Sequence, residues 1–543
     1  MNALRLPVAR LESVSIEITG QAKPRLVVNN VSFEVYPGET VCVVGESGSG
    51  KSMIAHSLIG LLPTHGVRHC SGQIFLGDTE ISALPEAALR KLRGAAVGMI
   101  FQEPMTALNP LMTIGQQLDE VFGAHGLMGA SVRRAKSIEV LTDVQLPDLA
   151  RVVSAYPFQL SGGQRQRVMI AMALALEPTL LIADEPTTAL DVTTQSQILT
   201  LIQELQIRRG IGILFITHDF GVVADIADRV LVMQKGCCVE SGSVGAVLNS
   251  PVHAYTRKLI AAVPALKDQP NVGMVPIQRA SLLQVSDLRK QYAGRGGRLT
   301  TALDCVSLHV DAGETVGVVG ESGCGKSTLA KVVVGLLQPD SGAVMFDGKS
   351  TVGLSRRQLG ATRYQIQMVF QDPYASLNPR HRVGEIIAAG PINIGVTRDV
   401  AYTRAAELIR MVGLAPSSLS GFPHQFSGGQ RQRISIARAL AMQPRLLIAD
   451  ESVSALDVSV QAQVLALLRE IRKELGLAIL FITHDLRVAS GLCDRIVVMR
   501  AGSIVEQGPA ASICGAPVQA YTRELIAAIP GRKARHDLVP VAQ

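Results

Sequence analysis

The sequence lacks the cysteine patterns of disulfide-rich and zinc-binding proteins. Its eight cysteines include no CxxC pair and no His–Cys cluster with zinc spacing. The first residues, MNALRLPVARLES, contain no apolar core of secretory length. We therefore expect free thiols in a reducing cytoplasm and find nothing in the sequence that favours export.

Long hydrophobic runs and blocks of like charge are also missing. The most apolar stretch, VMIAMALAL from Val168, stops at Glu177 and is far shorter than the roughly 20 residues that span a bilayer. We therefore expect that the chain does not cross a membrane by itself. The net charge of +7 is small for this length, and no five like charges are adjacent, so composition does not favour nucleic-acid binding.

The length and composition predict more than one globular domain. The chain has 543 residues, whereas a single core rarely serves more than roughly 250 to 300. With 47% apolar and only 18% charged residues, the chain has ample surface to bury, which excludes disorder for the bulk of it.

Several motifs occur twice in the same order. GESGSGKS at Gly45 returns as GESGCGKS at Gly320, while SGGQRQR, LLIADE and FITHD each recur 266 residues later. We therefore predict two homologous domains, residues 1–264 and 282–543. The segment between them, residues 265–281, has two prolines and little periodicity, as expected of a short linker.

Within each half the pattern is typical of an α/β fold. The apolar runs TVCVVG from Thr40, TLLIAD from Thr179 and GILFIT from Gly212 predict parallel strands that are buried on both faces. Helical patterns follow them, such as KSMIAHSLIGLL from Lys51. This alternation places a strand before, and a helix after, the glycine-rich motif.

That motif predicts two phosphate-binding loops. Both copies fit G-x-x-x-x-G-K-[ST], in which backbone N–H groups and a helix N-terminus face phosphate oxygens. Lys51 and Lys326 would reach the terminal phosphates, and Ser52 and Ser327 would ligate Mg²⁺. The remaining loop residues assigned to nucleotide binding are Gly45, Gly48, Gly50, Gly320, Gly323, Gly325 and Thr328.

Acidic pairs follow two of the buried strands. Asp184-Glu185 and Asp450-Glu451 would lie at the carboxyl edge of the sheet, where ligands of open α/β sheets bind. The aspartate suits Mg²⁺, and the glutamate suits polarising a water molecule. Taken alone such a pair is a helix cap, but beside a phosphate loop the catalytic interpretation is favoured.

SGGQ and ITHD complete the repeated set. Ser161 and Ser427 are natural N-caps, and the glycines behind them leave a helix N-terminus open to an anion. His218 and His484 follow apolar strands, where a phosphate contact competes with a structural role. The signature residues assigned to nucleotide binding are Ser161, Gly162, Gly163, Gln164, Ser427, Gly428, Gly429 and Gln430.

In this order, the motifs resemble the nucleotide-binding domain of ATP-binding cassette (ABC) ATPases. The set also includes FQEP with Gln102, FQDP with Gln371, and the ALD segments with Asp191 and Asp457. The resemblance covers nearly all of both halves. It implies two tandem P-loop NTPase domains, each with a mixed-sheet core and a helical subdomain that carries SGGQ.

The resemblance also implies how the parts act. Two ATP molecules would lie between the cassettes, with Lys51 facing Ser427 and Lys326 facing Ser161. Water would attack the γ-phosphorus, assisted by Glu185 or Glu451, with His218 or His484 at the phosphate. The residues expected to bind Mg²⁺ are Ser52, Gln102, Asp184, Ser327, Gln371 and Asp450.

An aromatic residue ahead of the loop stacks on adenine in this family. The second half offers Tyr292 for this role, and alignment places Ile18 opposite it in the first half. Because aromatic stacking adds to simple burial, we expect weaker ATP binding at the Lys51 site.

A narrower resemblance follows each cassette. SPVHAYTRKLIAAVP from Ser250 and APVQAYTRELIAAIP from Ala516 are similar to the C-terminal extension of dipeptide, oligopeptide, nickel and glutathione importer ATPases. A plain amphipathic helix that closes the domain is the alternative. The tail segments contain no cysteine, so no iron–sulfur cluster is expected.

This resemblance implies a peripheral subunit on the cytoplasmic face of the inner membrane. Its partners would be two permease subunits and, indirectly, a secreted solute-binding protein. The solute stays open among peptide, glutathione, a nickel complex and an opine-like compound. A soluble twin-cassette ATPase acting on ribosomes or DNA is the alternative, which the short linker and absent zinc spacing disfavour.

Overall fold

The computed structural model describes residues 6–19, 24–63, 65–126, 129–187, 190–264, 266, 280–293, 299–354, 356–360, 362–454 and 456–532. These form two compact units, one built mainly on residues before 264 and the other mainly on residues 280–529. The predicted linker, residues 265–281, lies outside the described residues except for positions 266, 280 and 281.

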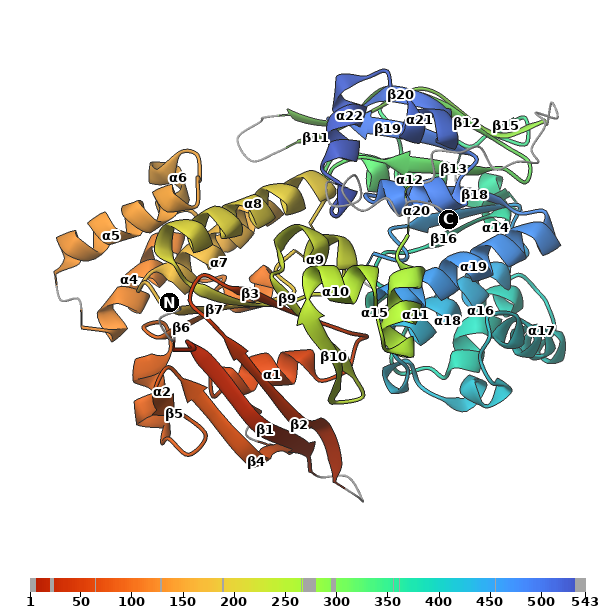
Figure 1. Ribbon diagram of the computed structural model, residues 1–543. Coiled ribbons are helices and arrows are strands. Elements are labelled where there is room, and N and C mark those ends of the chain that lie inside the picture. The colour runs from red at the N-terminus through yellow and green to blue at the C-terminus, as the bar shows by residue number, and fades with distance from the viewer. Residues whose placement is uncertain are drawn as a thin grey trace, which may run out of the picture. The chain divides into compact units, whose positions relative to one another are not determined.

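The first unit contains two sheets (Figure 1). An antiparallel four-stranded sheet has the order β2-β1-β4-β5, and a six-stranded sheet has the order β10-β9-β3-β8-β7-β6. The strands are β1 Ala9–Ile18, β2 Arg25–Val35, β3 Thr40–Val44, β4 Val67–Leu76, β5 Thr79–Glu80, β6 Val97–Ile100, β7 Leu180–Asp184, β8 Gly212–Ile216, β9 Arg229–Gln234 and β10 Cys237–Ser243.

The predicted buried strands form the middle of the six-stranded sheet. Strand β3 pairs in parallel with β8 on one side and with β9 on the other, so that Cys42 lies between Phe215 and Val230. Every residue of β3, β7 and β8 is buried. Only β10 runs antiparallel to its neighbour, so the sheet is mixed, as predicted.

Alternate residues of β3 belong to two different cores. Val41 and Val43 pack with the antiparallel sheet and α1, while Cys42 and Val44 pack with the larger group of helices on the opposite face. The helices are α1 Lys51–Leu58, α2 Glu86–Leu92, α3 Pro104–Ala107, α4 Ile114–Ala124, α5 Ala130–Asp143, α6 Leu149–Ser154, α7 Gly162–Leu174, α8 Val192–Arg209, α9 Phe220–Ile226, α10 Val244–Asn249 and α11 Ala254–Ala262.

The second unit repeats this architecture. Its sheets have the orders β12-β11-β14-β15 and β16-β17-β18-β13-β19-β20. The strands are β11 Ser281–Ala293, β12 Leu299–Asp311, β13 Thr315–Val319, β14 Ser341–Phe346, β15 Lys349–Ser350, β16 Ile366–Val369, β17 Leu446–Asp450, β18 Ala478–Thr483, β19 Arg495–Arg500 and β20 Ser503–Pro509.

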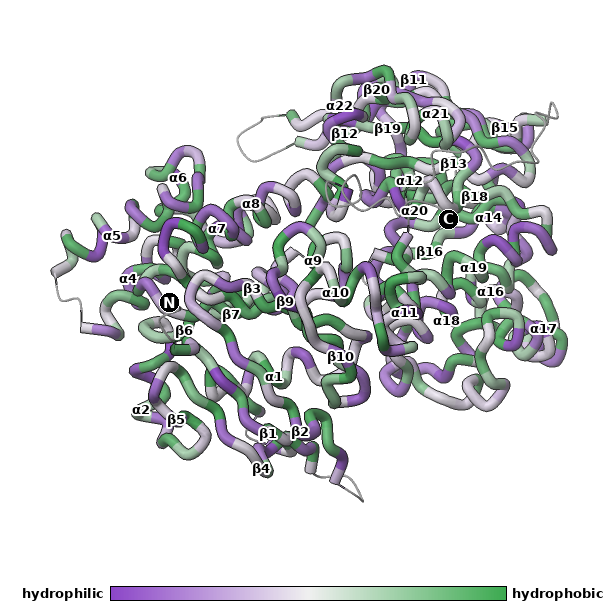
Figure 2. Tube along the Cα trace, viewed as in Figure 1, coloured by the Kyte–Doolittle hydropathy of each residue, from purple (hydrophilic) through white to green (hydrophobic). Residues whose placement is uncertain are grey.

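The helices of the second unit lie between corresponding strands, although the number of helices in a connection differs in places. They are α12 Lys326–Val333, α13 Arg356–Leu359, α14 Thr362–Gln365, α15 Pro373–Ser376, α16 Val383–Asn393, α17 Arg398–Met411, α18 Gly428–Leu440, α19 Val458–Leu475, α20 Leu486–Leu492, α21 Ala510–Gly515 and α22 Ala520–Ala527. Figure 2 shows the apolar character concentrated along the central strands. None of the described helices combines the length and apolar character needed to span a bilayer.

The helix that begins at SGGQ packs closely against the next long helix of its own unit. A Cβ added at Gly429 on α18 would lie 2.2 Å from Cγ1 of Val460 on α19, whereas one at Gly428 would lie 3.8 Å from Leu456. The first unit repeats the close approach, with 2.7 Å between a Cβ at Gly163 and Cγ2 of Thr194. The second glycine of each motif is therefore needed for packing.

We expect Gly429→Ala to destabilise the protein by about 1–3 kcal/mol, because the added methyl overlaps Val460. Gly428→Ala is the matched control and should change stability by no more than about 0.5 kcal/mol. Urea-unfolding midpoints measure both. Equal midpoints for the two variants would contradict the packing argument.

Candidate functional site

The phosphate-loop motif of each unit connects the central strand to the following helix, as predicted. In the first unit it lies between β3 and α1, and in the second between β13 and α12. A Cβ at Gly50 would lie 2.4 Å from the carbonyl oxygen of Val27, and one at Gly325 would lie 2.2 Å from that of Ala302. The φ angle is positive at both positions, so only glycine fits.

The loop lysine bonds to the backbone of its own loop. The Nζ atom of Lys51 donates to the carbonyl oxygens of Gly45 at 2.8 Å and Glu46 at 2.9 Å. Lys326 repeats both contacts at 2.8 Å, with Gly320 and Glu321. The lysines are only 5% and 4% exposed, so each positive charge is buried at the start of a helix.

The aspartate that ends β7 or β17 bonds to the loop serine of its own unit. Oγ of Ser52 donates to Oδ1 of Asp184 at 3.1 Å, and Ser327 makes the same bond with Asp450 at 3.1 Å. Burial is the main cause that raises the pKa of both aspartates. A buried carboxylate beside a hydroxyl is an oxygen donor set that suits Mg²⁺, whose charge would offset the lost hydration.

The next residue, a glutamate, has a left-handed backbone. Its φ angle is 46° at Glu185 and 44° at Glu451, a conformation that costs free energy for a residue other than glycine. Its side chain accepts a hydrogen bond from the glutamine of the FQEP or FQDP motif. Nε2 of Gln102 lies 3.1 Å from Oε2 of Glu185, and Gln371 lies 2.7 Å from Oε2 of Glu451.

The histidine of ITHD contacts the carboxylate of the same glutamate. Nδ1 of His218 is 3.4 Å from Oε2 of Glu185, and Nδ1 of His484 is 3.7 Å from Oε1 of Glu451. Burial opposes the charged form of His218, but the carboxylate of Glu185 outweighs this and raises the pKa of the imidazole. Burial likewise opposes ionisation of Glu451, yet His484 lowers the pKa of that carboxyl.

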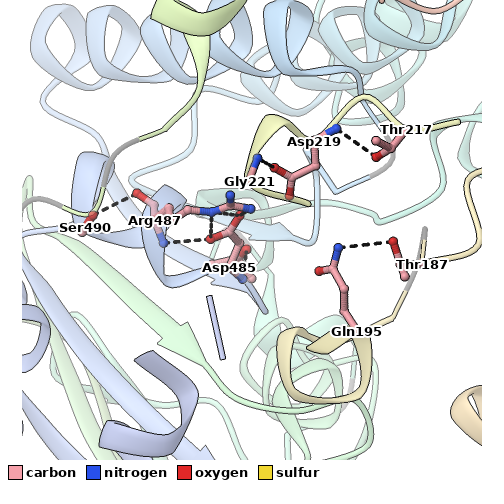
Figure 3. Close-up of polar contacts among 9 residues, drawn as sticks. Thr187, Gln195, Thr217, Asp219, Gly221, Asp485, Arg487 and Ser490 are labelled. Atoms are coloured by element: carbon pink, nitrogen blue, oxygen red, sulfur yellow. Dashed lines mark hydrogen bonds and ion pairs between the residues drawn. The ribbon is translucent and has the colours of Figure 1, made fainter. Parts of the chain in front are cut away.

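The residues after the histidine differ between the units, as Figure 3 shows. Asp219 accepts from the backbone N–H of Gly221 at 2.8 Å and caps α9. Asp485 caps α20 in the same way through Arg487 and also binds the guanidinium of that arginine, with Nη2 2.9 Å from Oδ2. The second unit therefore holds a partly buried ion pair where the first has a glycine.

SGGQ forms a capped helix start in each unit. The hydroxyl of Ser161 accepts from the N–H of Gln164 at 3.2 Å, and the Gln164 side chain accepts from the N–H of Ser161 at 3.1 Å. Ser427 and Gln430 form the same capping box, at 3.4 and 3.0 Å. The serine thus caps its helix, and this cap is compatible both with a purely structural role and with a helix N-terminus that binds an anion.

The sheet register supports the alignment of Ile18 with Tyr292. Both residues lie on strands ahead of the loop, and Tyr292 is 43% exposed. The equivalent strand pairs in the two units are Ile16 with Val28 and Lys290 with Leu303, followed by Ile18 with Arg25 and Tyr292 with Thr300. An aliphatic and an aromatic side chain thus occupy equivalent positions.

The sequence motifs assign no role to the tyrosine of each AYTR segment. The hydroxyl of Tyr255 accepts from the N–H of Glu46 at 3.2 Å, and Tyr521 accepts from Glu321 at 3.4 Å. The only signal available in the sequence was the recurrence of AYTR itself.

Comparison with known proteins fits this geometry. The ABC transporter family model matches residues 28–188 and 303–454, which is more than half of the chain. The chain belongs to the ABC transporter family. A second model, the oligopeptide/dipeptide transporter C-terminal region, matches residues 239–295 and 505–543.

Named ABC relatives match this chain over nearly its whole length. The chain is 46% identical over 531 residues to the peptidoglycan transport ATP-binding protein YejF of Agrobacterium fabrum, covering 96% of each chain. It is 44% identical over 562 residues to the glutathione import ATP-binding protein GsiA of Pectobacterium atrosepticum, covering 96% of this chain and 89% of that one. The ABC transporter ATP-binding protein YejF of Escherichia coli is 45% identical over 527 residues, covering 95% and 98%.

These findings confirm the predicted family, the α/β fold with two ABC ATPase domains, and ATP as the nucleotide bound by this ABC transporter ATPase. The prediction of an oligopeptide-type extension behind each cassette is also confirmed.

We expect Asp184→Asn and Asp450→Asn to raise the melting temperature of the Mg²⁺-free protein, because asparagine keeps the serine bond without burying a charge. The same variants should lose the additional thermal stabilisation that Mg²⁺ gives in the presence of ATP. Thermal scans with ATP plus Mg²⁺ and with ATP plus EDTA separate the two effects. Full Mg²⁺-dependent stabilisation in the double variant would contradict the metal assignment.

Proposed function

We propose that this ABC ATPase is the energy-coupling subunit of an importer for short peptides or related peptide-containing solutes. The observation that carries the proposal is the oligopeptide-type C-terminal region, which follows both cassettes. The relatives named for peptidoglycan and glutathione transport add support, because both solutes contain short peptides with unusual linkages. A nickel complex or an opine-like solute fits the family less directly.

The proposed partners are two membrane permeases and a secreted solute-binding protein. An importer ATPase acts through permeases, and no described helix of this chain could itself span a bilayer. The chain would therefore bind at the cytoplasmic face of the inner membrane by contacts with those subunits. The solute would contact the permeases and the binding protein only.

The proposed chemistry is attack of water on the γ-phosphorus of ATP. Lys51 and Lys326 would leave the loop carbonyls that they contact and bind phosphate oxygens. Glu185 and Glu451 would orient the water and accept its proton. His218 and His484 would each contact the γ-phosphate while also binding the glutamate of their own unit. Bound Mg²⁺, held by Ser52 and Asp184 or by Ser327 and Asp450, would neutralise phosphate charge.

We further propose that the cassettes span residues 1–264 and 282–543 and close head to tail over two ATP molecules. Lys51 would then share a site with Ser427, and Lys326 with Ser161. The open helix N-terminus behind each serine cap suits a phosphate from the other cassette. A linker at 265–281 would keep the two cassettes at high effective concentration.

We expect the double variant Glu185→Gln, Glu451→Gln to hydrolyse ATP at least about a hundredfold more slowly, because glutamine cannot accept a proton. ATP should remain bound, and the protein should stay in its closed form. Steady-state phosphate release measures the effect, and Glu177→Gln, on an exposed glutamate, is the control. Wild-type turnover in the double variant would overturn the catalytic assignment.

We expect the Lys51 site to bind ATP about two- to tenfold more weakly than the Lys326 site, because Ile18 cannot stack on adenine as Tyr292 can. Nucleotide titrations of Lys326→Ala and Lys51→Ala, each with one working site, measure the two affinities. Ile18→Tyr should tighten the first site, and Ile18→Leu should not. Equal affinities at the two sites would refute the proposed asymmetry.

A further inference from the structure

We propose that Tyr255 and Tyr521, in the C-terminal extensions, are positioning residues for the phosphate loops. Each hydroxyl fixes the peptide unit whose carbonyl oxygen holds the loop lysine. This inference rests on the proposed role of those loops in binding ATP.

The extension is anchored to the sheet of its own unit by one carboxylate. Glu240 on β10 accepts from the backbone N–H groups of Val252 and His253, at 2.7 and 3.1 Å. Glu506 on β20 repeats both bonds, with Val518 and Gln519, at 2.8 and 3.2 Å. The chain that enters α11 or α22 is therefore fixed two residues before the tyrosine.

Packing then holds the tyrosine ring in place. Tyr255 is 8% exposed and packs with Leu259 in the same apolar core as β3. Tyr521 is 5% exposed, packs with Leu525, and has the guanidinium of Arg500 4.6 Å above its ring. Each ring is thus held by its neighbours, so its hydroxyl has little freedom to move.

The hydroxyl binds a peptide unit that is engaged at both ends. Between Gly45 and Glu46, the N–H of Glu46 donates to Tyr255, and the carbonyl oxygen of Gly45 accepts from Lys51. The peptide between Gly320 and Glu321 has the same two partners, Tyr521 and Lys326. A rotation of this peptide would therefore move the lysine contact and break the tyrosine bond together.

The first loop glycine makes such a restraint necessary. Gly45 has φ 153° and Gly320 has φ 155°, and without a Cβ neither residue resists rotation of the adjoining peptide. Burial, followed by the charge of Glu321, raises the pKa of Tyr521, so this hydroxyl stays neutral near pH 7. The tyrosine thus supplies a fixed, uncharged acceptor that leaves the lysine charge available for phosphate.

A loop ordered before ATP arrives loses less conformational entropy on binding. Removing the hydroxyl should therefore weaken ATP binding and leave the chemical step intact. A tyrosine that only secured the extension helix would instead affect unfolding alone. The two roles predict different measurements.

The test uses the full chain with Tyr255→Phe, Tyr521→Phe and the double variant. Phenylalanine keeps the ring packing and removes only the acceptor. We expect the Kd and KM for MgATP to rise about three- to tenfold in the double variant, the range of one hydrogen bond, with kcat at saturating ATP within about twofold of wild type. Each single variant should weaken only its own site.

Tyr36→Phe is the matched control, because the Tyr36 hydroxyl donates to Glu34 and not to the loop. It should leave the Kd for MgATP unchanged. An unchanged Kd in the double variant, a fall in kcat at constant KM, or an equal change in the control would each overturn the inference. Wild-type protein that does not bind MgATP would overturn the proposed function, and this inference with it.

Discussion

A positive charge buried at the N-terminal end of a helix is the constraint on which each site depends. Lys51 and Lys326 begin their helices, where the helix dipole is also positive, and both are nearly inaccessible to solvent. Within the loop each lysine donates to two backbone carbonyl oxygens, and neutral carbonyls offset a buried charge only in part. A phosphate would satisfy the lysine, the loop N–H groups and the helix dipole at once. The loop is therefore built for an anion.

The acidic edge of the sheet faces the opposite electrostatic problem. Burial disfavours the charged form of Asp184 and Asp450, and the next residue is a second carboxylate. The chain keeps that glutamate in a left-handed conformation, with its N–H bonded to Ile216 or Ile482 of the neighbouring strand at 3.0 or 2.9 Å. Such strain persists where the surroundings fix it, and here a glutamine and a histidine bind the same carboxylate. Strain, burial and charge thus coincide at this edge of the sheet.

Much of each site could be predicted from sequence, because its parts are short linear motifs beside buried strands. Apolar runs located β3, β7 and β8, and parallel pairing brings their carboxyl ends to one edge. The contact of Val460 with Gly429 could not be predicted this way, because helix packing decides it. The bond that the N–H of Glu46 donates to Tyr255 joins segments 209 residues apart, and no local pattern specifies such a contact.

The internal duplication separates what the site needs from what it tolerates. The lysine, serine, aspartate, glutamate, glutamine and histidine contacts recur in both units, although the glutamine contact is 3.1 Å in one and 2.7 Å in the other. Ser49 is replaced by Cys324, and Gly221 by Arg487, without disturbing those contacts. The hydrogen bond between the tyrosine and the loop also recurs in both units, so it belongs with the contacts that the site needs. It recurs even though Arg500 lies over the ring of Tyr521 and its counterpart in the first unit is a glutamine. Its recurrence supports the proposal that the C-terminal extension helps to position the phosphate loop.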